Sequence, residues 1–325
     1  MTLAAADSRT ECATQCMLCG GATWAPHLRQ VVDYLSGAQF DIRRCESCNL
    51  RCTFPMPPDA EIDRYYPPRY RGNRHGFTGR MRTNLRCRAI EACFPKNFKG
   101  RLLDVGCGDG AFVTEMRRRG WDVCATEIDP ATVERLRQAG IDAKLPQEAE
   151  RDGFARSVDA VTCWHVMEHV ERPLQLAQWV KTQLKPGGVF QTTVPNIHSM
   201  QGRFFAGVWM HCDVPRHRYH FSPDTFRSLL TKAGYTIDSQ KVFAFEYDWF
   251  GVIQSALNMV CTERNVLFEK LTLPQTEPTG TSRPSKTDVI LSWVLAPPIA
   301  ALSLPVMLAA WAFGDGATLT LNCRV

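Results

Sequence analysis

The chain has 325 residues, of which 45% are hydrophobic and 22% charged, and its formal net charge is +5. These proportions are typical of a packed globular protein of one or two domains, and they exclude a fibrous or largely disordered chain. The mild net charge says little by itself, and nucleic acid is disfavoured as a partner because no recognition motif accompanies the charge.

Cysteine usage indicates the compartment. The chain has fourteen cysteines, and its first residues show neither a basic start nor an apolar stretch. A signal peptide needs both features, so we expect reduced thiols and metal binding instead of disulfides. The sequence therefore predicts a cytoplasmic protein.

The first segment, residues 1–60, contains two Cys-x2-Cys pairs. The pairs are Cys16 with Cys19 and Cys45 with Cys48, and 25 residues separate them. Two such knuckles complete a tetrahedral site of four sulfurs, which is the closed arrangement of structural zinc. The alternative is four unrelated thiols, which the paired spacing disfavours. We therefore expect a zinc-ribbon-like module in which Zn²⁺ stabilises a region too small for a core of its own.

A basic linker with helical stretches follows at 61–97, and residues 98–245 then alternate between strand-like and helix-like runs. The helical runs begin at a proline or a capping residue and end at a glycine. Strict alternation predicts an α/β fold, a doubly wound parallel sheet with helices on both faces. Strands are predicted at 101–107, 121–129, 158–164, 189–195 and 235–243, and helices at 110–120, 130–140, 173–188 and 223–234.

The first predicted strand ends in an acid that is followed by alternating glycines. Ligands of open parallel sheets bind beyond the carboxyl ends of the strands, where glycine lets the backbone turn sharply and approach a ligand. A carboxylate at the end of the second strand accepts hydrogen bonds from ribose hydroxyls. Dinucleotide-binding enzymes share this pattern, so hydride chemistry stays an alternative at this point. The residues concerned are Asp104, Gly106, Gly108, Gly110 and Glu127.

Four consecutive motifs narrow the choice. The chain contains, in this order, LLDVGCGDG, GWDVCATEID, DAVTCWHVMEHV and LKPGGVFQTTVPN, which resemble the motifs of class I S-adenosylmethionine-dependent methyltransferases. The resemblance covers about residues 100–245. It implies a Rossmann-like sheet of seven strands and S-adenosylmethionine as the cofactor. The stretch IDAKLPQEAE departs from the family pattern, because it offers no clear acid for the adenine amine.

The resemblance also implies roles for single residues. Asp104 and the glycine loop would hold the methionine part of the cofactor, and Glu127 would hold its ribose. Ile128 would pack on the adenine, and the residues at the end of the 158–164 strand would line the pocket. The cofactor-binding residues implied in this way are Asp104, Gly106, Cys107, Gly108, Gly110, Glu127, Ile128, Cys163, Trp164 and His165.

The acceptor is indicated by a wider resemblance. The two Cys-x2-Cys pairs, the core motifs and the later DVPRHRYHFS together resemble bacterial methyltransferases of surface-glycan and nucleotide-sugar biosynthesis. This resemblance implies transfer to a hydroxyl or carbon of a saccharide, nucleotide-sugar or lipid-linked glycan. Two alternatives stay open: a lipid-like small molecule such as a quinone precursor, and a cofactor-binding protein without turnover.

Removal of a proton from the acceptor calls for a base with a pKa near neutrality, for which histidine is suited. The candidates are His165, which follows the 158–164 strand, and His217 and His220 in the loop at 213–220. That loop has two interpretations. It is either a polar loop with satisfied hydrogen bonds or a substrate-binding segment whose arginines bind a phosphate or carboxylate.

Residues 289–313 contain no charged side chain and are long enough for a membrane span. Three prolines interrupt the run and no basic flank orients it, so a buried helical hairpin and an interfacial segment both stay open. The family sheet ends in an antiparallel strand, which we expect at 318–325. Residues 246–317 then form an insertion at the cofactor-binding edge. We expect its apolar part to contact the inner face of the cell membrane and to suit a lipid-bearing acceptor.

Overall fold

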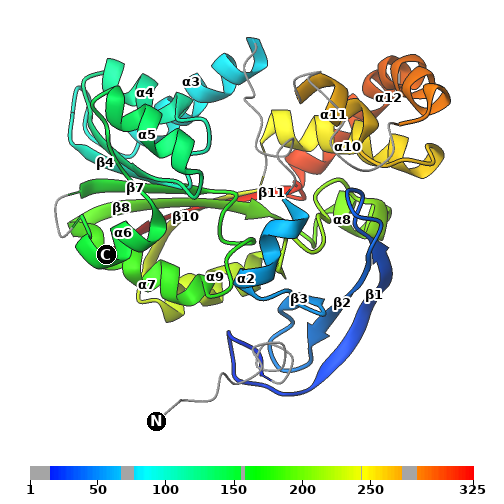
Figure 1. The fold of residues 1–325 in the computed structure, drawn as a ribbon, viewed down its shortest axis with the longest axis horizontal. Coiled ribbons are helices and arrows are strands. Elements are labelled where there is room, and N and C mark those ends of the chain that lie inside the picture. Colours follow the sequence, from blue (N-terminus) through cyan, green and yellow to red (C-terminus); the bar gives the residue numbers. More distant parts are fainter. Residues whose placement is uncertain (1–14, 67–76, 155–157, 243, 273–283) are drawn as a thin grey trace.

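The structure is a computed structural model that describes residues 15–66, 77–154, 158–242, 244–272 and 284–325. Parts of the predicted zinc module and of the basic linker lie outside these residues. The main sheet has seven strands in the order β10-β11-β8-β7-β4-β5-β6 (Figure 1). Its strands are β4 (Arg101–Val105), β5 (Asp122–Thr126), β6 (Asp142–Lys144), β7 (Val158–Trp164), β8 (Leu184–Pro195), β10 (Thr236–Lys241) and β11 (Thr318–Arg324).

The strand directions confirm the predicted α/β sheet. All neighbouring pairs from β8 to β6 are parallel, whereas β11 is antiparallel to both β8 and β10. Strand β10 therefore runs in the same direction as β8. The loop after β4 and the chain after β10 consequently leave the sheet at the same edge.

Helices cover both faces of the main sheet, as the alternation predicted (Figure 1). Helices α3, α4 and α5 lie on one face, and α6, α7 and α9 lie on the other. Side-chain caps begin two of them: Asp129 accepts from the Thr132 N–H at α5, and Ser222 accepts from the Thr225 N–H at α9. The bounds are α3 (Phe77–Glu91), α4 (Ala111–Arg118), α5 (Pro130–Gln138), α6 (Pro146–Asp152), α7 (Pro173–Gln183) and α9 (Pro223–Lys232).

A second sheet carries the N-terminal module, and one of its strands comes from the core. Its order is β1-β2-β3-β9. Thr53 strengthens the contact between β3 of the module and β9 of the core, which we call the joint. Its hydroxyl donates to the His217 carbonyl at 2.6 Å, and its N–H donates to the Arg218 carbonyl at 2.9 Å. The module is thus attached to the core by strand pairing. The bounds are β1 (Trp24–Val32), β2 (Gln39–Cys45), β3 (Arg51–Phe54) and β9 (Tyr219–His220).

Two buried arginines of the 213–220 loop hold the same joint together. The fully buried Arg216 lies 2.6 Å from a carboxylate oxygen of Asp33 and 2.6 Å from one of Asp213. Arg218, also fully buried, lies 2.6 Å from Asp59. Four short helices complete this region of the chain. The helix α2 (Asp59–Ile62) and the 3₁₀ helix Asp63–Tyr65 come after β3, and α8 (Met200–Phe205) and the 3₁₀ helix Ala206–Val208 come before β9. The interpretation that placed the arginines of this loop on a substrate phosphate is wrong for Arg216, because its charge is paired with two carboxylates inside the protein.

The insertion between β10 and β11 consists of α10 (Phe245–Val260), α11 (Val266–Thr272) and α12 (Lys286–Ala312) (Figure 1). Helix α12 passes through its three prolines as one element, so the hairpin alternative is wrong. It packs on α10 and α11 through one side only. Among the described residues, α12 is the one helix long and apolar enough to cross a membrane. The mean hydropathy of its apolar window is 1.9, and 11% of that window is buried.

Candidate active site

The loop between β4 and α4 forms one wall of the candidate active site. Gly106, Gly108 and Gly110 have φ angles of 71°, 58° and 72°, a region that other residues rarely adopt. A Cβ on Gly106 would lie 2.5 Å from Val166, and one on Gly110 would lie 2.6 Å from Leu136. Around a Cβ on Gly108, the described residues place no atom within 4 Å. The loop is therefore open to a ligand at Gly108.

Glu127 follows β5 and is held by the same loop. Its carboxylate accepts hydrogen bonds from the N–H groups of Gly108 at 2.7 Å and Ile128 at 2.8 Å. Burial raises the pKa of Glu127, and these N–H groups counteract the rise. Because each carboxylate oxygen has more than one lone pair, the group keeps acceptor capacity for a ligand hydroxyl. The neighbouring Ile128 is 56% exposed and offers an apolar surface beside the carboxylate.

Asp104 lies buried near the end of β4. Its carboxylate accepts a hydrogen bond from the Thr162 hydroxyl at 2.6 Å. Burial raises the pKa of Asp104 to about 7, although the Thr162 hydrogen bond and the charge of Arg86 counteract the rise. A buried carboxylate of this kind is stabilised by a positively charged ligand.

A second wall combines β7 with the insertion. The Arg86 guanidinium lies 4.5 Å from the ring centre of Trp164 at the end of β7. Arg86 also donates to the Tyr247 hydroxyl at 2.8 Å, and the Tyr247 ring lies 4.5 Å from that of His165. Sequence reasoning missed Arg86 and Tyr247 because neither belongs to a motif. The position of the insertion after β10 was the signal that could have pointed to Tyr247.

His165 stands beside this wall with an unusual backbone. Its φ of 57° lies in the left-handed region, and its N–H donates to the Thr193 carbonyl at 2.8 Å. Such a conformation in a residue other than glycine persists only where the surroundings hold it, and it is common at functional sites. The Nδ1 atom lies 3.3 Å from the buried Glu168 carboxylate, whose pKa burial raises to about 7. The His165 ring and the Glu168 carboxylate are therefore direct neighbours.

The other two predicted bases are packed in the interior. The Nε2 atom of His220 lies 3.0 Å from the Thr53 hydroxyl, at the contact between β3 and β9. The Nδ1 atom of His217 donates to the His211 carbonyl at 2.8 Å. Burial lowers the pKa of both histidines to about 3. Both side chains are therefore neutral near pH 7.

The two thiols of the predicted pocket are buried. Cys107 packs with Phe112 and Trp164, and Cys163 packs inside β7 against the opposite face. Burial raises the pKa of each thiol well above its ordinary value. Thiolates are the nucleophilic form, so these two side chains contribute packing and shape to the site.

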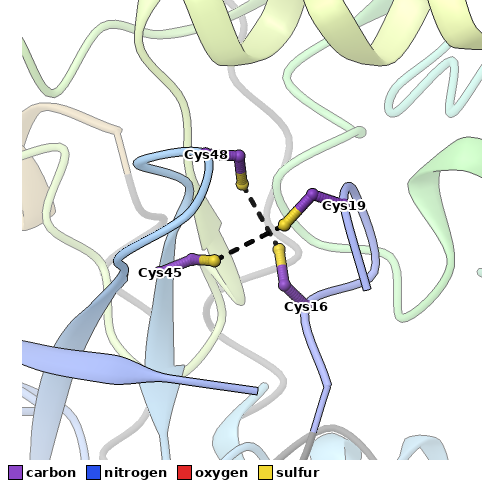
Figure 2. Close-up of side chains that lie close together, drawn as sticks. All are labelled: Cys16, Cys19, Cys45 and Cys48. Carbon is purple, nitrogen blue, oxygen red and sulfur yellow. Dashed lines mark hydrogen bonds between the residues drawn. The ribbon is translucent and has the colours of Figure 1, made fainter. Parts of the chain in front are cut away.

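The four predicted metal-ligating cysteines converge at the tip of the N-terminal module (Figure 2). All four sulfurs lie within 4.8 Å of one another, with Cys16 to Cys48 at 3.5 Å and Cys19 to Cys45 at 3.6 Å. Each knuckle ends in a residue of positive φ, Gly20 in the first and Asn49 in the second. Tetrahedral Zn–S bonds of about 2.3 Å separate sulfurs by about 3.8 Å, so the donor set fits zinc.

The comparisons with known proteins identify the core. A family model described as a methyltransferase domain matches residues 77–240, half of the chain. The chain belongs to this methyltransferase family. Its membership confirms the methyltransferase resemblance and the predicted fold, with the glycine loop and Glu127 inside the matched region.

This methyltransferase is similar to two curated proteins named ubiquinone biosynthesis O-methyltransferase. The protein of Pectobacterium atrosepticum is 36% identical over 105 residues, and that of Vibrio cholerae is 35% identical over 111 residues. The matches cover 30% and 31% of this chain and 44% and 45% of the relatives, so the chain spans less than half of their length. Among solved structures, it is similar to an S-adenosylmethionine-dependent methyltransferase of Mesorhizobium loti. That match has a TM-score of 0.43 and 16% identity and covers 73% of this chain and 96% of that one.

Proposed function

We propose that the protein transfers a methyl group from S-adenosylmethionine to a hydroxyl of a lipid-like small molecule of the quinone-precursor class. The observation that carries the proposal is the meeting of Asp104, Gly108 and Glu127 at one sheet edge in a chain of the methyltransferase family. Structural Zn²⁺ in the four-cysteine site is part of the proposal.

The residues at this edge fit the cofactor. Glu127 is suited to accept from the ribose hydroxyls, and the exposed Ile128 is suited to pack on the adenine. The Asp104 carboxylate offers a partner to the positively charged methionine part, and the open backbone at Gly108 permits close approach. When bound, the cofactor supplies an electrophilic methyl group. The chain itself has to align the acceptor and take its proton.

We assign the proton transfer to His165. Its Nδ1 atom lies 3.3 Å from the Glu168 carboxylate, and the Tyr247 ring packs against its ring. A histidine held this way accepts a proton from an acceptor hydroxyl, which typically contributes 10²–10⁴-fold to a rate. The packing of His217 and His220 favours a positioning role for these two side chains.

The acceptor class rests on two observations. The relatives are named for ubiquinone biosynthesis, which favours the quinone-precursor alternative over the saccharide that the wider resemblance implied. Helix α12 adds an apolar surface on the insertion that also supplies Tyr247. Its exposed large apolar residues are Ile290, Trp293, Val294, Leu302, Val306, Leu308 and Trp311. A large exposed apolar patch marks an interaction surface.

We assign this surface to the membrane. Helix α12 rests on α10 through Leu295 and Ile299, and the Trp249 indole donates to the Ala300 carbonyl at 3.1 Å. The opposite side of α12 remains exposed and is suited to lie in the lipid interface. A protein bound at the inner face of the cell membrane by α12 holds its active site beside the insertion, where a prenylated acceptor can reach it.

Methyl transfer is tested with labelled S-adenosylmethionine and matched acceptors. These are a polyprenyl catechol, the same catechol without its tail, and a panel of saccharides and nucleotide-sugars. We expect label on a phenolic oxygen, with a lower KM for the prenylated compound. Label on a saccharide and none on either catechol would overturn the acceptor, and no transfer at all would favour a binding protein without turnover.

Three variants test the assigned residues in the same assay. Glu127→Ala weakens cofactor binding in calorimetry, because the ribose loses its acceptor. His165→Gln lowers kcat by roughly 10²–10⁴-fold, a larger factor than any loss of cofactor affinity in calorimetry. His220→Gln, a histidine variant at the β3–β9 contact, tests the competing base. A larger loss of kcat in His220→Gln than in His165→Gln would reverse the assignment.

Co-sedimentation with phospholipid vesicles tests the membrane surface. Replacement of Trp293, Leu302 and Val306 by serine removes apolar area from the exposed side of α12 and leaves its contact with α10 in place. We expect the wild-type chain to sediment with the vesicles and the triple variant to stay in solution. Equal partition of the two proteins would refute the membrane assignment.

A further inference from the structure

Two histidines and a glutamate meet between the end of β7 and the 213–220 loop. Glu168 and His169 follow β7, and His217 comes from the loop that leads into β9. One ligand atom of each lies within 4.8 Å of the others. The three residues are separate from the four-cysteine site and from the residues proposed to hold the cofactor.

Hydrogen bonds to backbone carbonyls orient the two histidines. The Nδ1 atom of His217 lies 2.8 Å from the His211 carbonyl oxygen, which only accepts, so this Nδ1 carries the hydrogen and Nε2 has a free lone pair. The Nδ1 atom of His169 lies 3.0 Å from the Arg216 carbonyl oxygen and 2.9 Å from the Tyr66 hydroxyl, and metal binding through Nε2 requires the tautomer in which Nδ1 donates to the carbonyl. Metal-binding histidines in proteins show this arrangement, because the carbonyl orients the ring.

Glu168 supplies the charge of the cluster. Its side chain is 1% exposed, and neither carboxylate oxygen accepts a hydrogen bond from the residues that the structure describes. One of these oxygens lies 3.3 Å from His165 Nδ1. Buried carboxylates need a partner, and a cation between Glu168 and the two imidazoles provides one.

The backbone holds the two segments of the cluster in register. The Glu168 carbonyl accepts from the N–H of Arg218 at 2.8 Å and from the N–H of Tyr219 at 3.2 Å. Arg218 and Tyr219 in turn continue into the strand contact with Thr53. Backbone hydrogen bonds therefore hold the segments that carry the three side chains in fixed positions, as a metal site requires.

We propose that Glu168, His169 and His217 bind a divalent first-row transition metal ion. Two imidazole nitrogens and one carboxylate oxygen form a donor set that suits manganese, iron or zinc. Three protein ligands leave positions on the ion open for water or another small ligand, unlike the closed four-cysteine site. The proposal concerns binding alone and does not depend on the methyl-transfer reaction.

The test uses the full chain with zinc in its four-cysteine site and neither cofactor nor acceptor present. Manganese(II) is the probe, because it prefers oxygen and nitrogen ligands and competes poorly for thiolates. Titration is followed by the electron paramagnetic resonance signal of free manganese, and metal content is measured by plasma mass spectrometry. We expect one manganese per chain in addition to one zinc.

Three variants locate the manganese. Glu168→Gln and His217→Gln each weaken manganese binding by roughly tenfold or more, since each removes a ligand. His220→Gln, a buried histidine outside the cluster, keeps the wild-type affinity. A variant that keeps one zinc and the wild-type circular dichroism spectrum is folded. If His217→Gln fails this check, the manganese affinity of Glu168→Gln alone tests the site. Absence of manganese binding by the wild type, or equal binding by Glu168→Gln, would overturn the proposal.

Discussion

The glycine loop and the 213–220 loop are both rich in polar groups, but they are built in opposite ways. The glycine loop is open at Gly108, and its carboxylate partner Glu127 follows the neighbouring strand β5. The 213–220 loop is closed, with Arg216 fully buried and paired to Asp33, which is 183 positions away in the sequence.

The contrast between the open and the closed loop distinguishes a loop suited to bind a ligand from a loop that holds two parts of the protein together. The backbone at Gly108 faces open space, and the Glu127 carboxylate beside it keeps acceptor capacity, so we expect a ligand to approach there. In the 213–220 loop, Arg216 pairs with Asp33 and His220 bonds to Thr53, so these two side chains hold the N-terminal module on the core. A run of arginines and histidines in a loop is therefore no sign of substrate contact until its partners are known.

The largest expected effect comes from loss of the zinc site. Cys45→Ser/Cys48→Ser removes both sulfurs of the second knuckle, and structural zinc contributes about 10–16 kcal/mol in isolated finger peptides. We expect no bound zinc and rapid proteolysis within residues 15–54, while cofactor affinity changes by less than about threefold.

The matched control for the zinc site is Cys52→Ser, a buried cysteine of β3 outside the four-sulfur cluster. It should retain one zinc and resist the protease. Protection of the double variant equal to that of Cys52→Ser would contradict a structural zinc site.

Breaking the buried ion pairs of Arg216 should have the next largest effect. Arg216→Met leaves the Asp33 and Asp213 carboxylates buried without their cation, which typically costs about 3–5 kcal/mol. Urea denaturation measures this loss as a fall in the free energy of unfolding. Arg216→Met/Asp33→Asn should recover part of it, because one uncompensated charge is removed. A fall of less than about 1 kcal/mol in the free energy of unfolding of Arg216→Met would show that these ion pairs do not hold the N-terminal module on the core.

The sequence predicted the features that depend on neighbouring residues and missed those that depend on residues far apart in the chain. The main sheet and the glycine loop were predictable because strand periodicity, capping residues and the Gly-x-Gly-x-Gly pattern are local signals. The pairing of β3 with β9 and the contact of Arg86 with Tyr247 were not, since each joins residues more than 150 positions apart. Helix α12 was misjudged as a possible hairpin because a proline weakens a helix locally without having to end it.

The buried Asp104 near the end of β4 predicts a pH dependence of stability. The pKa of Asp104 is raised to about 7 from an ordinary 3.8, so the folded state binds the proton more tightly than the unfolded state. The free energy of unfolding therefore falls as pH rises between these values, by up to about 4 kcal/mol. Asp104→Asn, which cannot ionise, should be more stable than the wild type at pH 8 and lose that advantage near pH 4.

Cofactor affinity should change with pH in the direction opposite to stability. The charged form of Asp104 is the one that attracts the cationic methionine part, so wild-type affinity should rise as pH increases through 7. Asp104→Asn should bind more weakly and with a flatter pH profile. Calorimetry with the cofactor between pH 6 and pH 8 measures both, and parallel profiles for the two proteins would show that Asp104 does not contact the cofactor.

The smallest expected effect distinguishes two positions within the glycine loop. Alanine at Gly106 or Gly108 adopts a left-handed backbone, which costs about 1–2 kcal/mol of stability at either position. At Gly106 the new methyl group also meets Val166, so unfolding should be easier in Gly106→Ala than in Gly108→Ala. At Gly108 the methyl group points into the open space, so cofactor affinity should fall further than the stability loss explains. If Gly108→Ala bound S-adenosylmethionine as tightly as the wild type, the open side of the loop would not be the cofactor site.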